Sequence, residues 1–198
     1  MDMKESSQTQ FAILGLLQLG PMSGYDLKQT VDQSIGHFWR EGWGRIYPTL
    51  HGLEAAGLVA KRTETKTGQK RGRPERNVYT LRPAGRKRLR EWLSRGWTPE
   101  VYRNELLLKV FFGRSAAAGV TRRHVERFRE QCVAEIATYG AALKAIEGEH
   151  AQSHPDDAPF WKMTVHYGLH RSRALKEWAE ETLEALDGLV KEQETAAK

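Results

Sequence analysis

Cysteine is almost absent from this chain of 198 residues, which contains only Cys132. A single thiol excludes an intramolecular disulfide and a cysteine-built zinc site, and it favours a reducing compartment. Long apolar runs are absent too, because no stretch reaches the ~18 residues that a membrane helix needs. The first ten residues, MDMKESSQTQ, are polar and do not resemble an export signal. These absences predict a cytoplasmic protein without a membrane span.

Signatures of catalysis are also missing from the sequence. No nucleophile and base can be assigned as a pair, and neither a P-loop nor a dinucleotide-binding glycine motif is present. His166 and His170 have the i, i+4 spacing of a helical metal site, but no third ligand is evident nearby. We therefore expect no enzyme, no cofactor and no metal site. A metal-dependent enzyme built on these histidines ranks last among the hypotheses.

Positive charge, in contrast, is abundant in the first half of the chain. Residues 1–97 contain 17 Lys and Arg against 9 Asp and Glu, whereas residues 98–198 contain 14 against 16. Such asymmetry predicts that the first half binds a polyanion and that the second half has a different role.

The first half has the pattern of three helices. Ser7, with Gln10 three residues later, predicts the start of a buried helix, and Ser23 predicts the cap of a second helix. A third helix has an apolar face made by Ile46, Leu50 and Leu53. It should begin near Gly44 or Arg45, because Pro48 is tolerated only close to a helix start.

A basic hairpin follows the third helix. Residues 58–60 and 77–81 have the composition of strands, and Pro83 can occupy the first position of a fourth helix. Three helices followed by a two-stranded hairpin are typical of a winged helix-turn-helix domain, in which the third helix enters the major groove of DNA. The sequence therefore predicts a winged helix over residues 1–97.

Basic and polar side chains of the third helix and the hairpin are the candidate DNA contacts. Arginine and lysine suit phosphates, while tyrosine, threonine and histidine on the groove-facing side can contact base edges. The candidates are Arg45, Tyr47, Thr49, His51, Lys66, Lys70, Arg71, Arg73 and Arg76. A solvated, mobile loop is the alternative interpretation of the basic run, and ordinary exposed helix residues are the alternative for the three polar candidates.

The second half is predicted to be all-helical. Residues 106–112 are too apolar for periodicity to separate helix from strand. From Thr121 onward, apolar residues recur every three or four positions and form a narrow seam suited to packing against another helix. A last helix follows the turn-like segment 154–159. The predicted fold is therefore mainly α, with an all-helical dimerisation and effector-response domain over residues 98–198.

Several motifs in the first half resemble the PadR family of bacterial transcriptional regulators. They are Ile13-Leu14-Gly15-Leu16-Leu17, Ser23-Gly24-Tyr25-Asp26-Leu27, Arg45-Ile46-Tyr47-Pro48-Thr49-Leu50, Leu53-Glu54, Gly57-Leu58-Val59 and Gly72-Arg73-Pro74-Glu75-Arg76-Asn77-Val78-Tyr79. Residues 103–113 are similar, more loosely, to the helical arm of the longer family members. Two departures matter: His51-Gly52 replace positions that are often charged, and Arg82 replaces a threonine that usually caps the fourth helix.

The resemblance implies a homodimer that binds a roughly two-fold DNA operator, usually represses transcription and is released by small, often aromatic compounds. The implied dimer interface combines the first helix with the helical arm: Phe11, Leu14, Val125, Phe128, Ile136, Leu143, Leu183 and Leu186. Trp97, Trp161 and Trp178 are candidates for lining an effector chamber, although core packing is the alternative for each. Cys132, on the apolar seam, is expected to pack rather than sense oxidants. The competing hypothesis is a winged helix that binds RNA or an acidic protein without operator specificity.

Overall fold

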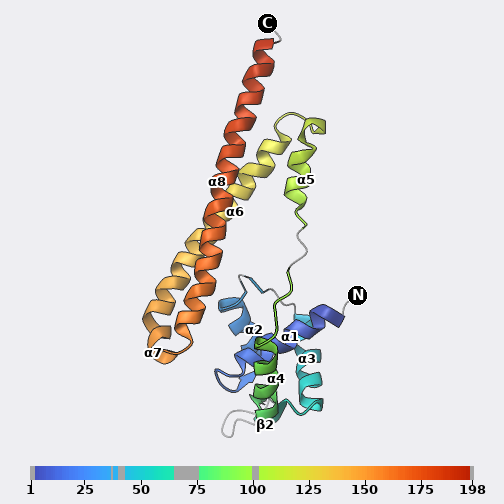
Figure 1. Ribbon diagram of the computed structural model, residues 1–198, viewed down its shortest axis with the longest axis vertical. Coiled ribbons are helices and arrows are strands. Elements are labelled where there is room, and N and C mark those ends of the chain that lie inside the picture. Colours follow the sequence, from blue (N-terminus) through green and yellow to red (C-terminus); the bar gives the residue numbers. More distant parts are fainter. Residues whose placement is uncertain (1–2, 37, 40–42, 65–75, 100–102, 197–198) are drawn as a thin grey trace, which may run out of the picture. The chain divides into compact units, whose positions relative to one another are not determined.

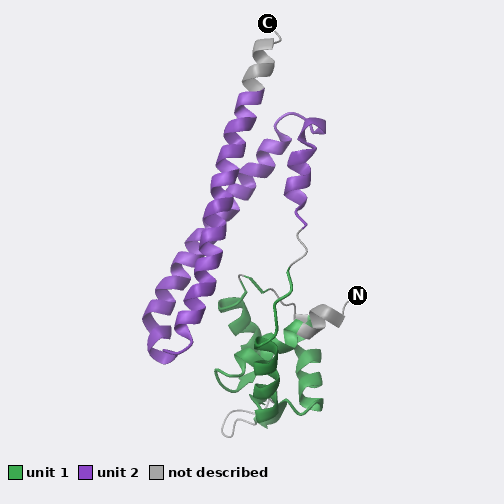
Figure 2. Ribbon diagram, in the orientation of Figure 1, with its two compact units in different colours: residues 1–99 green, residues 100–198 purple. Residues whose placement is uncertain are grey.

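The two halves of the chain fold as separate units, Met1–Pro99 (unit 1) and Glu100–Lys198 (unit 2), in the computed structural model (Figure 2). The structure describes residues 3–36, 38–39, 43–64, 76–99 and 103–196, without the side chains of residues 3–7, 43 and 190–196.

Unit 1 has the element order that the sequence predicts, with one addition. Its elements are α1 (Met3–Leu16), β1 (Met22–Ser23), α2 (Gly24–Gln33), α3 (Trp43–Ala55), β2 (Val59–Glu64), β3 (Arg76–Leu81) and α4 (Pro83–Leu93) (Figure 1). The added element is β1, which pairs with β3 so that the antiparallel sheet has the order β1-β3-β2. The predicted two-stranded wing is confirmed as β2 and β3. Strand β1 could not be predicted, because two residues are too few to show a period of two.

The core of unit 1 is built by the predicted apolar face of α3. Ile46, Leu50 and Leu53 are buried against apolar residues of α1, α2 and the sheet. Helix α1 adds Phe11, whose ring stacks on that of Trp92 in α4 with 4.6 Å between centroids. This packing holds the apolar face of α3 against the core, and the opposite face of the helix is exposed to solvent.

The helix starts of unit 1 follow the sequence signals in three of four cases. Helix α3 begins at Trp43, one residue before the expected range, and α4 has Pro83 in its first turn. Helix α2 is capped by Ser23, as predicted. The capping box predicted at Ser7 is wrong, because α1 begins at Met3 and includes Ser7 in its interior.

Unit 2 is helical throughout its described residues. It contains α5 (Glu105–Phe111), the short η1 (Gly113–Ser115), α6 (Val120–Ala145), the π-helical turn η2 (Ile146–His150), α7 (Ala151–Ser153) and α8 (Ala158–Ala196). Helices α6 and α8 lie side by side and run antiparallel (Figure 1). The ambiguity over residues 106–112 is thus resolved in favour of a helix, which Asn104 caps by accepting a hydrogen bond from Leu107 N at 3.1 Å.

The seam predicted on α6 packs against α8 of the same chain. One cluster joins Tyr139 and Ile146 to Val165 and Leu169, and another joins Val125 to Ala179 and Leu183. Although α8 is 39 residues long, no helix in the described part of the chain is apolar enough to cross a membrane.

Candidate nucleic-acid interface

Four of the predicted DNA contacts lie on α3. Arg45, Tyr47 and His51 are exposed, and Thr49 is half-buried. The face opposite carries the buried residues Ile46 and Leu50, so the polar side chains are held outward by the core. This is the orientation that reading a DNA groove requires.

Two of these polar side chains are engaged within the protein. The Thr49 hydroxyl donates to the backbone oxygen of Arg45 at 2.7 Å, so its proton is used and only its acceptor lone pairs are free to meet a base. The ring of Tyr47, 44% exposed, lies against the backbone of Gly24 at the start of α2. A Cβ at Gly24 would come within 2.6 Å of Tyr47 Cε1. Tyr47 is therefore placed by α2 as well as by its own helix.

Two glycines of α3 have open space beside them in the described part of unit 1. A Cβ added at Gly44 or Gly52 would meet no atom of the described residues within 4 Å. Glycine in a helix costs up to about 1 kcal/mol relative to alanine. The absence of side chains at these positions lets another molecule approach the backbone of α3.

The base of the wing carries paired charges. Arg62 of β2 forms an ion pair with Glu64, and Arg76 of β3 forms one with Asp26 of α2. Lys66, Lys70, Arg71 and Arg73, predicted to contact DNA, lie outside the described residues. Arg76 is thus the predicted wing contact that the described residues include, and it lies beside α2.

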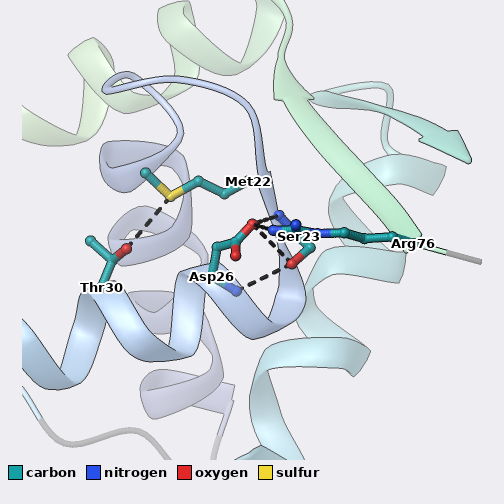
Figure 3. A network of polar contacts seen from close by, with 5 residues as sticks. All are labelled: Met22, Ser23, Asp26, Thr30 and Arg76. Atoms are coloured by element: carbon teal, nitrogen blue, oxygen red, sulfur yellow. Dashed lines mark hydrogen bonds and ion pairs between the residues drawn. The ribbon is translucent and has the colours of Figure 1, made fainter. Parts of the chain in front are cut away.

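Asp26 is a residue of this surface that sequence reasoning did not select. Its Oδ2 accepts from Ser23 N at 2.9 Å and from Ser23 Oγ at 3.0 Å, and it meets the Arg76 guanidinium (Figure 3). Burial acts to raise the pKa of Asp26, but the hydrogen bonds from Ser23 and the contact with Arg76 outweigh burial and the pKa is lowered. Ser23 followed three residues later by an acidic residue is a capping-box signal, so the sequence could have indicated the role of Asp26 in capping α2. No sequence signal links Asp26 to Arg76, which is distant in the chain.

Two of the three tryptophans predicted as effector contacts, Trp161 and Trp178, pack in different clusters of unit 2. Trp97, at the end of unit 1, is 82% exposed. Trp161 packs with Ile146 and lies near His150, whereas Trp178 packs edge-on against Phe128 in the other cluster of unit 2. Trp161 and Trp178 are 17 positions apart on α8, a separation of about 25 Å along a helix. Within one protomer these two rings cannot line a single small-molecule site.

The side chains predicted to form the dimer interface are used largely inside the protomer. Phe11 is 4% exposed and Leu14 has no exposed surface. The arm residues pack between α6 and α8: Val125, Phe128, Ile136, Leu143, Leu183 and Leu186. Most of the exposed large apolar side chains of unit 2 lie elsewhere, on α5 with its C-cap Phe112 and on the start of α8: Leu107, Leu108, Phe111, Phe112, Phe160, Met163 and Tyr167. Val133 on α6 and Leu189 in the later part of α8 are exposed as well.

The candidate metal and redox residues have ordinary surroundings. The rings of His166 and His170 stack with 6.2 Å between centroids, and the described residues contain no group of three His, Cys, Asp or Glu side chains placed to hold a metal ion. Cys132 is buried, and burial, together with Glu135, raises the pKa of its thiol. A buried thiol of raised pKa is a poor nucleophile, which agrees with a packing role.

A winged helix with an outward-facing third helix places the protein in the helix-turn-helix class. Comparison with known families identifies its family within this class. Residues 13–91 match the Transcriptional regulator PadR-like family, and residues 102–187 match the family described as Virulence activator alpha C-term. The chain is 30% identical to the Negative transcriptional regulator PadR of Bacillus subtilis (strain 168) over 183 residues, which cover 90% of this chain and 97% of that protein. The chain belongs to the PadR-like family of transcriptional regulators, and the resemblance seen in the sequence is confirmed.

Solved structures share the fold over nearly the whole chain. Bacillus subtilis PadR in complex with operator DNA is 25% identical with a TM-score of 0.62, covering 90% of this chain and 98% of that one. The same protein with p-coumaric acid gives a TM-score of 0.59 at 25% identity, covering 94% and 98%. The Vibrio cholerae virulence activator AphA, 23% identical, covers 91% and 98% with a TM-score of 0.71 and shows likeness of fold alone.

Proposed function

We propose that this protein is a dimeric, operator-binding repressor that a small aromatic or hydrophobic compound releases from DNA. The observation that carries the proposal is the outward-facing polar side of α3 beside the charged base of the wing, in a chain that matches a negative transcriptional regulator over nearly its full length. Operator DNA and p-coumaric acid are ligands of that Bacillus subtilis relative in its solved complexes. They supply the classes of partner proposed here.

Phosphate contacts supply most of the proposed DNA affinity. Arg45 on α3 and the basic residues of the wing neutralise phosphates, and each neutralised phosphate releases counterions. Base recognition is assigned to Tyr47, His51 and the acceptor lone pairs of Thr49. Gly52, open to solvent on the same face, permits the close approach that these short side chains need.

The proposed dimer uses apolar surface that the protomer leaves exposed. Clustered exposed apolar side chains mark interaction surfaces more often than isolated ones do. Leu107, Leu108, Phe111 and Phe112 form the α5 face, and Phe160, Met163 and Tyr167, spaced three and four residues apart, form the α8 face. We assign the partner contact to these faces, with half-buried members of the predicted set, such as Phe128 and Leu186, at their margins.

Release by an effector requires differential affinity. A compound shifts the dimer away from DNA only if it binds the DNA-incompetent arrangement more tightly than the competent one. Trp97, Trp161 and Trp178 stay the candidates for stacking on a flat compound, and Trp161 and Trp178 would do so at different places along α8 of one protomer.

The test of DNA binding uses two probes. Genomic fragments are selected on the purified protein, and one recovered fragment (the selected fragment) is compared with a duplex of the same length and composition in random order (the shuffled duplex). Arg45→Ala should weaken binding to both probes and reduce the slope of log affinity against log salt by about 0.9 for one lost phosphate contact. His51→Ala should mainly lower the preference for the selected fragment.

Arg173→Ala is the matched control, because Arg173 is an exposed arginine of α8 in unit 2. Its salt slope should equal that of the wild-type protein. Equal slopes for Arg45→Ala and Arg173→Ala would reject the assignment of α3 to DNA. Equal affinity of the wild-type protein for the two probes would instead favour an RNA-binding or protein-binding winged helix.

A further inference from the structure

The first turn of α2 contacts both elements that are proposed to meet DNA. Ser23 pairs with Val78 of β3 through strand β1 and also caps α2 through its side chain. Gly24 supports the ring of Tyr47 from α3, and Asp26 holds Arg76 from β3. Three residues within positions 23–26 thus join α2 to α3 and to the wing, and Figure 3 shows the contacts of Asp26 with Ser23 and Arg76.

The contact between Asp26 and Arg76 restricts the orientation of the Arg76 guanidinium. Arg76 is the first residue of β3 and pairs in the ladder with Glu64, so it stands at the end of the hairpin nearest the wing tip. Its side chain is 48% exposed and that of Asp26 is 33% exposed. The carboxylate occupies Nη2 of the guanidinium, which has five donors in all. This contact holds the guanidinium in one direction, and we assign its remaining donors to a phosphate.

The contact between Gly24 and Tyr47 has a similar consequence for α3. The ring rests on bare backbone, and any side chain at position 24 would displace it. Tyr47 also interacts electrostatically with Tyr79 of β3, whose pKa is raised first by burial and further by Glu54 and Tyr47. The Tyr47 ring is therefore positioned by the start of α2 as well as by its own helix.

We propose that the first turn of α2 is a bracket that sets the position of Tyr47 relative to Arg76, with Gly24 and Asp26 as positioning residues for DNA recognition. This inference rests on the proposed DNA-binding function. The bracket acts on geometry more than on folding, because an exposed ion pair contributes little to the free energy of unfolding.

The test compares Asp26→Asn with Asp32→Asn. Both changes remove one negative charge from α2, but Asp32 is paired with Lys28 rather than with the wing. Asparagine at position 26 keeps an oxygen that can accept from Ser23 N, so the helix cap is retained, while the negative charge that holds the Arg76 guanidinium is removed. The probes are the selected fragment and the shuffled duplex, and circular dichroism with the thermal midpoint checks the fold of each variant.

If the bracket positions Arg76, Asp26→Asn should lower affinity for the selected fragment about three- to tenfold, the range expected for one positioned hydrogen bond. Its affinity for the shuffled duplex should stay equal or rise, because the net charge becomes more positive. Asp32→Asn should keep the wild-type ratio of the two affinities. If both variants bind the selected fragment more tightly than wild type, Asp26 acts only as a local charge and the bracket is rejected.

Gly24→Ala provides a second, uncharged perturbation. The added methyl displaces the Tyr47 ring, which is partly exposed and can swing outward, so the fold should be retained while the preference for the selected fragment falls. Gly140→Ala, where a Cβ meets no atom within 4 Å, is the control and should leave the preference unchanged. An unchanged preference in Gly24→Ala and Asp26→Asn together would overturn the bracket alone. A wild-type protein that shows no preference would overturn the proposed function, and the bracket with it.

Discussion

A close approach between α6 and α8 gives a prediction of stability that can be worked out from the structure. At Gly168 of α8, an added Cβ would lie 2.4 Å from Cζ and 2.7 Å from the hydroxyl oxygen of Tyr139 in α6. Tyr139 is buried in the same cluster as Val165 and Leu169, so its ring cannot swing into solvent. Gly168→Ala should therefore force the two helices apart or drive Tyr139 out of its rotamer.

Two terms of opposite sign set the magnitude. Overpacking in a well-packed core costs about 1–3 kcal/mol, whereas replacing a helical glycine by alanine stabilises by up to about 1 kcal/mol. Gly188→Ala, in the same helix but with no atom within 4 Å of the added Cβ, has only the second term. We expect Gly188→Ala to stabilise the protein and Gly168→Ala to be about 1–3 kcal/mol less stable than Gly188→Ala.

The assay is urea unfolding followed by circular dichroism at one fixed protomer concentration, because the stability of an oligomer depends on concentration. A double-mutant cycle isolates the clash, since Gly168→Ala should become stabilising once Tyr139 is also replaced by alanine. Equal stabilisation by Gly168→Ala and Gly188→Ala in the presence of Tyr139 would refute the packing argument.

Two further predictions concern assembly and pH. Phe111→Glu and Phe160→Glu place charges on the α5 and α8 faces and should shift sedimentation from dimer to monomer without unfolding. Thr138→Glu, on the exposed side of α6, is the control. If both phenylalanine variants sediment like the wild-type protein, both faces are rejected as dimer contacts. The folded pKa of Asp26 lies below its usual 3.8, so its contribution to stability is complete above that value and is lost as pH falls through the folded pKa. Any difference in urea midpoint between wild type and Asp26→Asn should therefore be constant near neutrality and shrink below about pH 4; a difference that grows on acidification would contradict the sign.

Local signals in the sequence predicted most of the helices and two of the three strands. The cap at Ser23, the proline at the start of α4 and the apolar face of α3 act over a few residues, so each could be seen without tertiary information. Strand β1 was missed because it is defined only by its pairing with β3. The contact between Asp26 and Arg76 was missed for the same reason, since it joins residues 50 positions apart.

The apolar seam of α6 shows where periodicity is ambiguous. A repeat of three and four residues predicts that a helix packs against another helix, but it does not tell whether the other helix belongs to the same chain. In this protein α8 supplies the partner, and residues such as Val125 are buried before any dimer forms. The side chains that remain for a second protomer, including Phe111 and Phe160, do not follow the seam.

The sign of the Asp26 effect on DNA binding depends on a comparison of two small energies. A carboxylate about 10 Å from a phosphate in water is repelled by roughly 0.4 kcal/mol, and salt screens part of this. Immobilising a free arginine side chain on binding costs about 0.5–1.5 kcal/mol, and an ion pair already present in the free protein removes part of that cost. Because the second term is larger, the carboxylate should favour specific binding despite its charge. On the shuffled duplex, where Arg76 meets no defined phosphate position, only the repulsion is left, so Asp26→Asn should leave the affinity for this probe equal or raise it while the affinity for the selected fragment falls.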